Sequence, residues 1–210
     1  MRSRKEELAE LVGITLGDGS LYVNKKHKIY QFVITGHIKN DKEYFERFIF
    51  PLLERRFGKN FKWKFDIKTN GIRIRSQKRS IVKMISKLGI PIGNKLKNNV
   101  RIPDWIFGDK NLIRACIRGL IDTDGFVTPI TGRNYSYIWF SSQIPALQES
   151  FSKAMEILEF KTSKWRQGVN TASQIFVGAK PMIVKYFSEI NFNNPYHKNR
   201  FKLPSSSPVK

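Results

Sequence analysis

The sequence predicts an α+β fold made of two pseudo-symmetric halves. Two observations support this prediction: a nine-residue pattern occurs twice, and period-two alternation of apolar and polar residues marks strands after it. The two copies occupy residues 11–19 and 117–125. Each is an apolar run that ends in Asp-Gly and opens a segment of about a hundred residues, which is the signature of an internal repeat.

The spacing of other residues supports a duplication. Trp63 and Trp165 are 102 residues apart, and so are the Ile-Val-Lys triplets at 81–83 and 183–185. The acids that end the two motifs are 106 residues apart. Because the two spacings differ by four residues only, we interpret the chain as two copies of one ancestral unit.

Both motifs predict helices that pack against each other. Small residues recur every four positions, at Ala9, Gly13 and Gly17 and at Ala115, Gly119 and Thr123. Residues four apart share one helix face, and small side chains allow close approach of two backbones. Glycine costs roughly 1 kcal/mol in a helix, so its use here indicates a packing role. Gly19 and Gly125 are expected to end the helices in the left-handed conformation.

This packing places Asp18 and Asp124 side by side at two helix C-termini. The helix dipole disfavours a carboxylate there, and two close carboxylates repel each other unless a cation lies between them. Carboxylate oxygens without Cys or His nearby suit Mg²⁺. For either copy alone, an ordinary Asp-Gly turn after a buried helix is the alternative.

These motifs resemble the signature of the LAGLIDADG homing endonucleases in their single-chain, two-motif form. The second copy keeps both acids of the signature, whereas the first has Leu16 at the earlier acidic position. The resemblance implies two αββαββα repeats whose concave antiparallel sheets form a DNA-binding saddle. It also implies that Asp18 and Asp124 are the catalytic metal ligands and that Asp122 is not one; Gly17 and Thr123 are predicted to belong to the same metal site.

The resemblance further implies a lysine late in each repeat that assists catalysis. Lys95 is the candidate in the first repeat, and Lys198 is the nearest counterpart in the second. The family often has a glutamine at the end of the second strand that orients water. Gln143 occupies that region in the second half, whereas the first half has His37, which is either the water-positioning group or a phosphate contact.

The expected elements follow from periodicity and turn residues. In the first half they are a helix at 4–17, a hairpin at 21–35, a helix at about 41–57 interrupted or kinked near Pro51, a hairpin at 61–75 and a helix at 78–88. In the second half they are a helix at 110–122 capped by Asp109, and strands from 126, at 135–142 and within 164–177. The predicted repeats are 1–97 and 110–203, with a linker at 98–109 and a disordered tail at 204–210.

The charge predicts a nucleic-acid partner. The chain has 38 Lys and Arg against 17 Asp and Glu, a net charge of +21. Such an excess favours binding to phosphates, although a merely solvated basic surface is the alternative. The expected contacts with double-stranded DNA are Tyr22, Asn24, Lys26, Lys28, Gln31, His37, Lys62, Lys64, Arg73, Arg75, Arg133, Asn134, Ser142, Gln143, Lys164 and Arg166.

The remaining composition limits the cell context. The single cysteine, Cys116, excludes an internal disulfide and a cysteine-based zinc site, and it is expected to be buried. No signal peptide or membrane-spanning run is visible, so a soluble intracellular protein is expected, cytoplasmic in a prokaryote or organellar.

Together these features predict a monomeric, intron-encoded endonuclease that makes a double-strand break in a long asymmetric DNA target by phosphodiester hydrolysis. Two or three Mg²⁺ ions are expected, with Mn²⁺ able to substitute and Ca²⁺ supporting binding without cleavage. The alternatives are an RNA maturase that assists splicing of its own intron and a non-enzymatic DNA-binding regulator. The maturase would tolerate loss of the acids, and the regulator is expected to need an added helix-turn-helix domain for which little length remains.

Overall fold

The computed structural model describes residues 3–132, 134–168 and 172–204. The first half contains α1 (Arg4–Asp18), β1 (Gly19–Asn24), β2 (Ile29–His37), α2 (Ile38–Tyr44), η1 (Phe45–Ile49), α3 (Phe50–Phe57), β3 (Lys62–Asp66), β4 (Gly71–Ser76) and α4 (Arg79–Lys87). The second half contains η2 (Asp104–Gly108), α5 (Lys110–Asp124), β5 (Gly125–Pro129), β6 (Ser136–Ser142), α6 (Pro145–Ile157), β7 (Arg166–Gln167), β8 (Ser173–Val177), α7 (Lys180–Glu189) and α8 (Pro195–Arg200). The predicted α+β class is confirmed.

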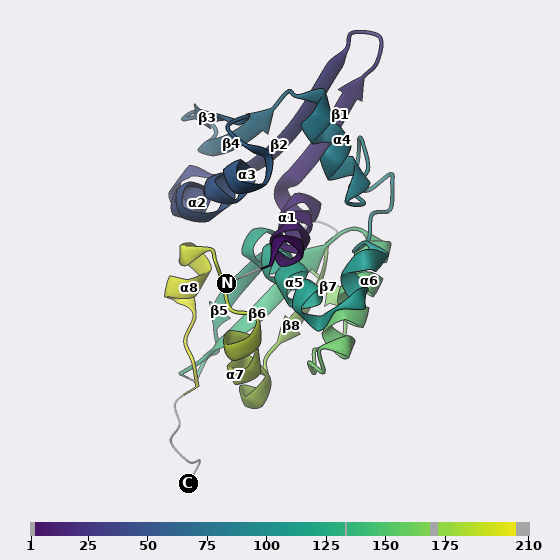
Figure 1. The fold of residues 1–210 in the computed structure, drawn as a ribbon. Helices are drawn as coiled ribbons and strands as arrows, with labels where there is room; N and C mark the ends of the chain where they lie inside the picture. Colours follow the sequence, from purple (N-terminus) through teal and green to yellow (C-terminus); the bar gives the residue numbers. More distant parts are fainter. Residues whose placement is uncertain (1–2, 133, 169–171, 205–210) are drawn as a thin grey trace.

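Each half has one four-stranded antiparallel sheet, and the two sheets lie on opposite sides of the central helices α1 and α5 (Figure 1). The strand orders are β1-β2-β4-β3 and β5-β6-β8-β7. The registers also match: Gly19 pairs with Ile34, and Gly125 pairs with Phe140, 106 residues further along in both strands. Therefore positions where both sheets have a strand can be matched one to one.

The helices α1 and α5 touch backbone to backbone, as the small-residue pattern predicts. A Cβ atom on Gly13 would lie 2.1 Å from the carbonyl oxygen of Cys116, and one on Gly119 would lie 2.4 Å from that of Glu10. Only glycine fits at such a contact. Cys116 is fully buried at this interface, as expected from the sequence.

A buried ion pair joins the same two helices. Arg118 on α5 donates from Nε and one terminal nitrogen to the two carboxylate oxygens of Glu10 on α1, at 2.8 and 2.7 Å. Its third nitrogen donates to the carbonyl of Ile190 at 2.9 Å, and Asn193 donates to Glu10. Glu10 has no exposed surface, so these donors replace the water that it loses on folding.

Two details of the sequence prediction are wrong. Gly19 and Gly125 are extended, with φ of −93° and −95°, because each is already the first residue of a strand. They are small for another reason: a Cβ on either would collide with the last turn of the preceding helix, at Thr15 or Ile121. The acids are consequently the last helical residues, and α5 extends two residues beyond the expected 122.

The second helix of the first half begins at Ile38, three residues before its predicted start. The predicted interruption near Pro51 is confirmed, and it takes the form of the π-helical segment η1 just before the proline. Proline has no N–H to donate, and the Phe50 N–H bonds the carbonyl of Phe45, five residues back. The Asp109 cap is confirmed, since its side chain accepts the N–H of Asn111 at 2.7 Å. No helix in the described ranges is long and apolar enough to cross a membrane.

Candidate active site

Two carboxylates meet where the central helices end. Asp18 and Asp124 are the last residues of α1 and α5, and β1 and β5 start at the next residue. A Cβ atom on Gly17 would lie 2.0 Å from the Thr123 hydroxyl oxygen and 3.4 Å from the carboxyl carbon of Asp124. The close approach of the helices therefore continues to their last residues and holds the two acids at one place.

Burial disfavours the charged forms of both acids, and repulsion by neighbouring carboxylates adds to this effect at Asp18. Burial, followed by the charges of Asp124 and Asp41, raises the pKa of Asp18 to about 7. Burial raises the pKa of Asp124 to about 6, although Lys95 opposes the shift. Among the described residues, no donor hydrogen-bonds either carboxylate. A bound cation would therefore stabilise the charged forms of both acids.

Because the pKa of Asp18 is raised, we expect that replacing this carboxyl group stabilises the folded protein, and that the gain depends on pH. An unfolded aspartate ionises near pH 4, whereas folded Asp18 keeps its proton to about pH 7, so its ionisation destabilises the native state as pH rises between these values. We expect Asp18→Asn to stabilise the metal-free protein by on the order of 3 kcal/mol at pH 7.5 and very little at pH 4.

Urea unfolding in EDTA at several pH values measures this difference. Comparing variant with wild type removes the opposite contribution of His197, whose pKa burial lowers to about 4. Asp104→Asn, which changes an aspartate with 81% of its side chain exposed, is the control. A stability gain that is the same at pH 4 and pH 7.5 would contradict the prediction.

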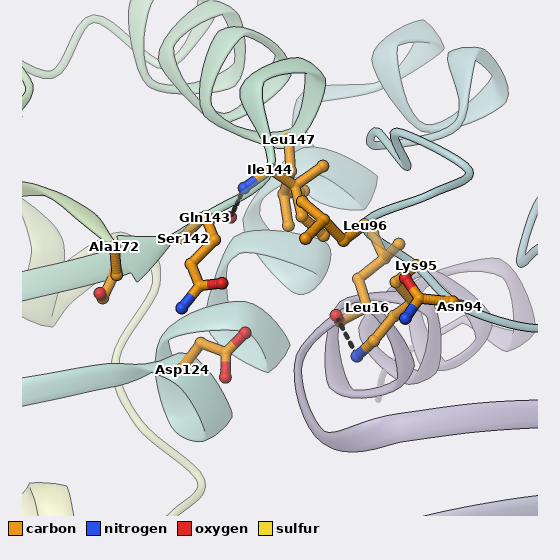
Figure 2. Close-up of a pocket in the computed structure, with 11 residues that line it drawn as sticks. Leu16, Asn94, Lys95, Leu96, Asp124, Ser142, Gln143, Ile144, Leu147 and Ala172 are labelled. Carbon is orange, nitrogen blue, oxygen red and sulfur yellow. Dashed lines mark hydrogen bonds between the residues drawn. The ribbon is translucent and has the colours of Figure 1, made fainter. Parts of the chain in front are cut away.

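Lys95 lies between the end of α1 and a pocket of about 510 Å³ (Figure 2). Its ammonium group donates to the carbonyls of Thr15, Leu16 and Gly17, at 3.4 and 2.7 Å for the first two. Burial lowers its pKa, and the charges of Asp124 and Asp18 oppose this shift. The lysine thus offsets the negative end of the helix dipole and the charge of both acids.

The same pocket contains Asp124 and Gln143. In Figure 2 the Gln143 amide and the Asp124 carboxylate face the same space, and Asn94 lies beside Lys95. The structure therefore places three groups around one cavity: the carboxylate of Asp124 from α5, the ammonium of Lys95 from the loop after α4 and the amide of Gln143 from the loop after β6.

The surroundings of Asp18 are chemically different. By sheet register, His37 is the counterpart of Gln143, and its backbone N–H bonds Asp41 at 2.8 Å. Asn194 donates to Asp41 and to the carbonyl of Asp122, both at 3.0 Å. Asp122 matches Leu16, so Asn194 takes the position at the end of α5 that Lys95 takes at the end of α1.

Lys198 is not the structural counterpart of Lys95. It is an exposed residue of the short helix α8, four residues beyond Asn194. Lys198 lies near the spacing expected from the sequence, but at the end of α5 it is Asn194 that donates a hydrogen bond to the carbonyl of Asp122. A catalytic role of Lys198 stays a prediction, and its position does not match that of Lys95.

Asp41 and Asn194 were missed by sequence reasoning. Neither belongs to a recognisable pattern, and they are 153 residues apart in the chain. One signal was available: His37-Ile-Lys-Asn-Asp41 follows a strand, and an acid in the first turn of a helix is a common cap. Nothing in the sequence indicated that this cap would also face Asp18.

The solvent face of the first sheet collects the predicted basic contacts. Its strands alternate as expected, with Lys62 opposite Arg75 and Lys64 opposite Arg73, while the Ile72 and Ile74 side chains face the core. This face has a groove of about 280 Å³, lined by Ser20, Tyr22, Gln31, Val33, Thr35, Lys64, Arg73 and Arg75. Asn24, Lys26 and Lys28 lie at the tip of the β1–β2 hairpin, where Asn24 accepts the N–H of His27 at 3.1 Å.

The residues predicted to contact DNA in the second half differ in their exposure. Asn134, Gln143, Lys164 and Arg166 are exposed, whereas Arg133 lies outside the described residues. Ser142 points toward the core, is 7% exposed and accepts the N–H of Ile144 at 3.1 Å. Ser142 nevertheless lines the same pocket as Gln143, the next residue, which the strand register turns outward; contact of Ser142 with DNA stays a prediction.

No family model matches the sequence. The chain is 26% identical over 209 residues to the replication factor C small subunit of Methanocaldococcus jannaschii, which covers 92% of this chain but only 11% of that protein. Among solved structures, the homing endonuclease I-DmoI in complex with DNA and Mn has a TM-score of 0.64, with 17% identity and coverage of 89% and 97% of the two chains. The N-terminal LAGLIDADG domain of DUF199/WhiA has a TM-score of 0.61, with 14% identity and coverage of 90% and 84%.

The chain has the LAGLIDADG fold. The helices α1 and α5 are its two motif helices, as the resemblance implied. The same fold is shared by a homing endonuclease and by WhiA, so the fold alone does not decide between cleavage and binding without cleavage.

The other motif residues, Gly17, Thr123 and Asp122, form hydrogen bonds within the protein. The Gly17 carbonyl accepts Lys95, and the Thr123 hydroxyl donates to the carbonyls of Gly119 and Leu120 at 2.9 and 3.1 Å. Asp122 is buried, and one of its oxygens accepts the Asn193 N–H at 2.9 Å, away from the pocket that Asp124 lines. Within the described ranges no three His, Cys, Asp or Glu side chains gather into a metal site, which leaves Asp18 and Asp124 as a two-carboxylate pair.

Proposed function

We propose that this chain is a metal-dependent, site-specific endonuclease that hydrolyses both strands of a long asymmetric DNA target and acts as a monomer. One observation carries the proposal: two partly buried acids meet at the paired ends of α1 and α5, close to Lys95 and without hydrogen-bond donors from the described residues. A protein that only binds DNA gains nothing from holding two carboxylates in this way, because they repel phosphate.

Each residue has a role in this proposal. Asp18 and Asp124 hold divalent cations, Lys95 stabilises negative charge that develops on the scissile phosphate, and Gln143 orients the attacking water on its side. His37 takes the corresponding place near Asp18. Such fixed groups stabilise developing charge without reorganisation during the reaction.

The residues present fit Mg²⁺. This ion is commonly held by one or two carboxylates together with substrate phosphates and water, so a two-carboxylate pair suffices once DNA is bound. The bound ion would lower the pKa of a water molecule and neutralise charge on the leaving oxygen. The I-DmoI structures with Mn, Mg and Ca support the choice of a divalent ion.

The basic face of the first sheet is proposed to bind duplex DNA. Changing Arg73 and Arg75 to alanine should weaken binding about tenfold at low salt and lower the salt slope by roughly one per arginine. Fluorescence anisotropy with labelled duplex at several salt concentrations measures both quantities. The matched control is Arg47→Ala with Arg101→Ala, which removes two arginines with 77% and 63% exposed side chains away from this face. Equal losses in the two double variants would show that only net charge matters.

A selection from a randomised duplex library tests the function itself. Protein is bound to the library in Ca²⁺, the retained DNA is recovered, and Mg²⁺ is then added. We expect one long asymmetric site that is cut only after Mg²⁺ is present. Tight binding without cutting in Mg²⁺ or Mn²⁺ would overturn the nuclease assignment.

A further inference from the structure

The second half pairs a segment of its own chain with a free strand edge. The strand β8 pairs with β6 only from Ile138 onward, so β6 has no strand beside it on that edge at Ser136. The Ser136 N–H donates to the carbonyl of Lys202, and the Lys202 N–H donates to the Ser136 hydroxyl, both at 3.1 Å. The chain after α8 is thus added to the edge of the sheet.

An aromatic ring holds this segment in place. Phe201 stacks on Phe187 of α7, with ring centroids 5.5 Å apart and planes at 9°. Its centroid is 5.3 Å from that of Phe192. The second half therefore fills the space between β6 and α7 with one backbone pairing and one large apolar side chain.

The first half has the same free edge. Tyr30 of β2 matches Ser136, because Val23 pairs with Tyr30 as Pro129 pairs with Ser136, 106 residues further along. The strand β4 pairs with β2 only from Phe32 onward, so no described strand lies beside Tyr30 on that edge. By the alternation of an antiparallel pair, the N–H of Tyr30 points to the open edge as that of Ser136 does.

A groove of about 460 Å³ lies between this edge and α4, which packs beside β2 (Figure 1). Val23 and Tyr30 line it from the hairpin, and Ser86 lines it from α4. Counted from the first residue of each helix, Ser86 has the place in α4 that Phe187 has in α7. The first half therefore leaves open the groove that the second half fills with Phe201.

The floor of this groove is apolar and its rim is basic. Met84 on α4 and Ile92 in the following loop are 43% and 46% exposed. The basic residues that line the groove are Lys25, Arg79, Lys83 and Lys87. The described lining includes no carboxylate, and α4 itself has three basic residues and no acidic one. Exposed apolar side chains inside a polar rim mark an interaction surface, and a positive rim favours an acidic partner.

The groove suits a polypeptide better than DNA or a second copy of this chain. Val23 and Tyr30 alternate along their strands with Tyr22 and Gln31, which line the basic face proposed to bind duplex DNA, so the groove is on the other side of the sheet. A nucleic acid has no backbone that continues a β-sheet. A second copy, with a net charge of +21, would bring like charge to the basic rim.

We propose that the groove between β2 and α4 binds an extended, acidic segment of a partner protein. The segment pairs with the edge of β2 at Tyr30 and places one large apolar side chain against Met84 and Ile92, while flanking Asp or Glu residues pair with the basic rim. Main-chain hydrogen bonds to a strand edge supply affinity, and pockets for alternate side chains supply specificity. This inference goes beyond the proposed cleavage, since it uses neither the two acids nor the DNA-facing surface.

Anisotropy titrations of the full chain with labelled peptides test the proposal in the absence of DNA and metal. The basic probe copies residues 199–203, and the acidic probe replaces both basic residues of that sequence with glutamate. We expect the acidic probe to bind at least about tenfold more tightly, with a preference that shrinks as salt is added. Replacing the phenylalanine of the acidic probe with serine should weaken its binding about tenfold, because the apolar floor then loses its partner.

A substitution on the groove floor tests the apolar contact. Met84→Asp should weaken binding of the acidic probe about tenfold or more, because it places a like charge and removes apolar surface. Val184→Asp is the matched control, since it introduces the same charge at a 47% exposed apolar residue of α7. The Met84 variant should cleave the selected target in Mg²⁺ at the wild-type rate, so each proposal can fail without the other.

A charge reversal on the rim tests the electrostatic part. Lys83→Glu with Lys87→Glu should invert the preference, so that the basic probe binds more tightly than the acidic one. The control is Lys153→Glu with Lys161→Glu, which reverses two exposed lysines of the second half and should keep the preference for the acidic probe.

Amide hydrogen exchange measured by NMR gives a readout that is specific to edge pairing. The Tyr30 N–H should exchange more slowly when the acidic probe is bound, whereas the Ser136 N–H, which is already paired, should not change. Equal affinity for the two probes, equal losses in the controls, or an unchanged Tyr30 amide would overturn the proposal. Self-association of the chain that Met84→Asp removes would make a second copy the occupant, and nucleic-acid binding at this groove without peptide binding would make it a polyanion site; either result would also overturn it.

Discussion

Changing Asp124 to asparagine should abolish double-strand cleavage while leaving DNA binding intact. Asparagine has nearly the same shape, but it lacks the charge that holds a divalent cation, so transition-state stabilisation is lost. We expect the rate to fall at least a thousandfold, or about 4 kcal/mol, and the same for Asp18→Asn. The measurement is single-turnover cleavage of the selected target in Mg²⁺, together with duplex affinity in Ca²⁺.

The control is Asp122→Asn, which changes the other acid of the same motif. Asp122 is buried and bonded to the Asn193 N–H, so its substitution should affect stability more than the cleavage rate of the folded protein. Cleavage at near wild-type rate by the Asp124 variant would show that the metal assignment is wrong. Loss of binding in Ca²⁺ would show that the acid contributes to DNA affinity instead of chemistry.

Adding a single methyl group at Gly13 should destabilise the whole chain. The new Cβ atom would lie 2.1 Å from the Cys116 carbonyl oxygen and 3.0 Å from the Leu120 nitrogen, both backbone atoms of α5. The two helices must separate to admit it, which disturbs the packing along their full contact. We expect Gly13→Ala to lower the free energy of unfolding by about 3 kcal/mol or more.

Gly108→Ala is the matched control, because nothing lies within 4 Å of a Cβ atom at that position. Urea unfolding gives both values. The Gly13 variant should also cleave more slowly than its folded fraction accounts for, since the acids sit at the ends of the displaced helices. A loss of stability equal to that of the Gly108 variant would mean that the helices tolerate separation.

The central part of the fold follows from sequence because its signals are local. Small residues at i and i+4 directly report a backbone contact, and alternation over 61–75 reports which face of a sheet is buried. The first of these features also places Asp18 and Asp124 together, because both acids end the helices that touch. The predicted boundaries of the repeats and the site roles of the individual residues stay predictions.

The rest depends on contacts that no local pattern encodes. Asn194 substitutes for a lysine because of where the chain turns after α7, and Asp41 reaches the site from the start of α2. Ser142 and Gln143 are neighbours in sequence and both line the pocket, yet the strand register leaves Ser142 buried and Gln143 exposed.

The buried ion pair has a consequence for how the two halves recognise each other. In the aligned motifs, the residue that matches Glu10 is Cys116, and the residue that matches Arg118 is Val12. Two copies of the first half would therefore bury Glu10 against valine, and two copies of the second would bury Arg118 against cysteine. An unpaired buried charge costs several kcal/mol, so each half rejects its own copy and accepts only the other. Neither half can therefore form a stable symmetric homodimer through this helix pair. If the two halves were separated, we expect them to reassemble only as a heterodimer.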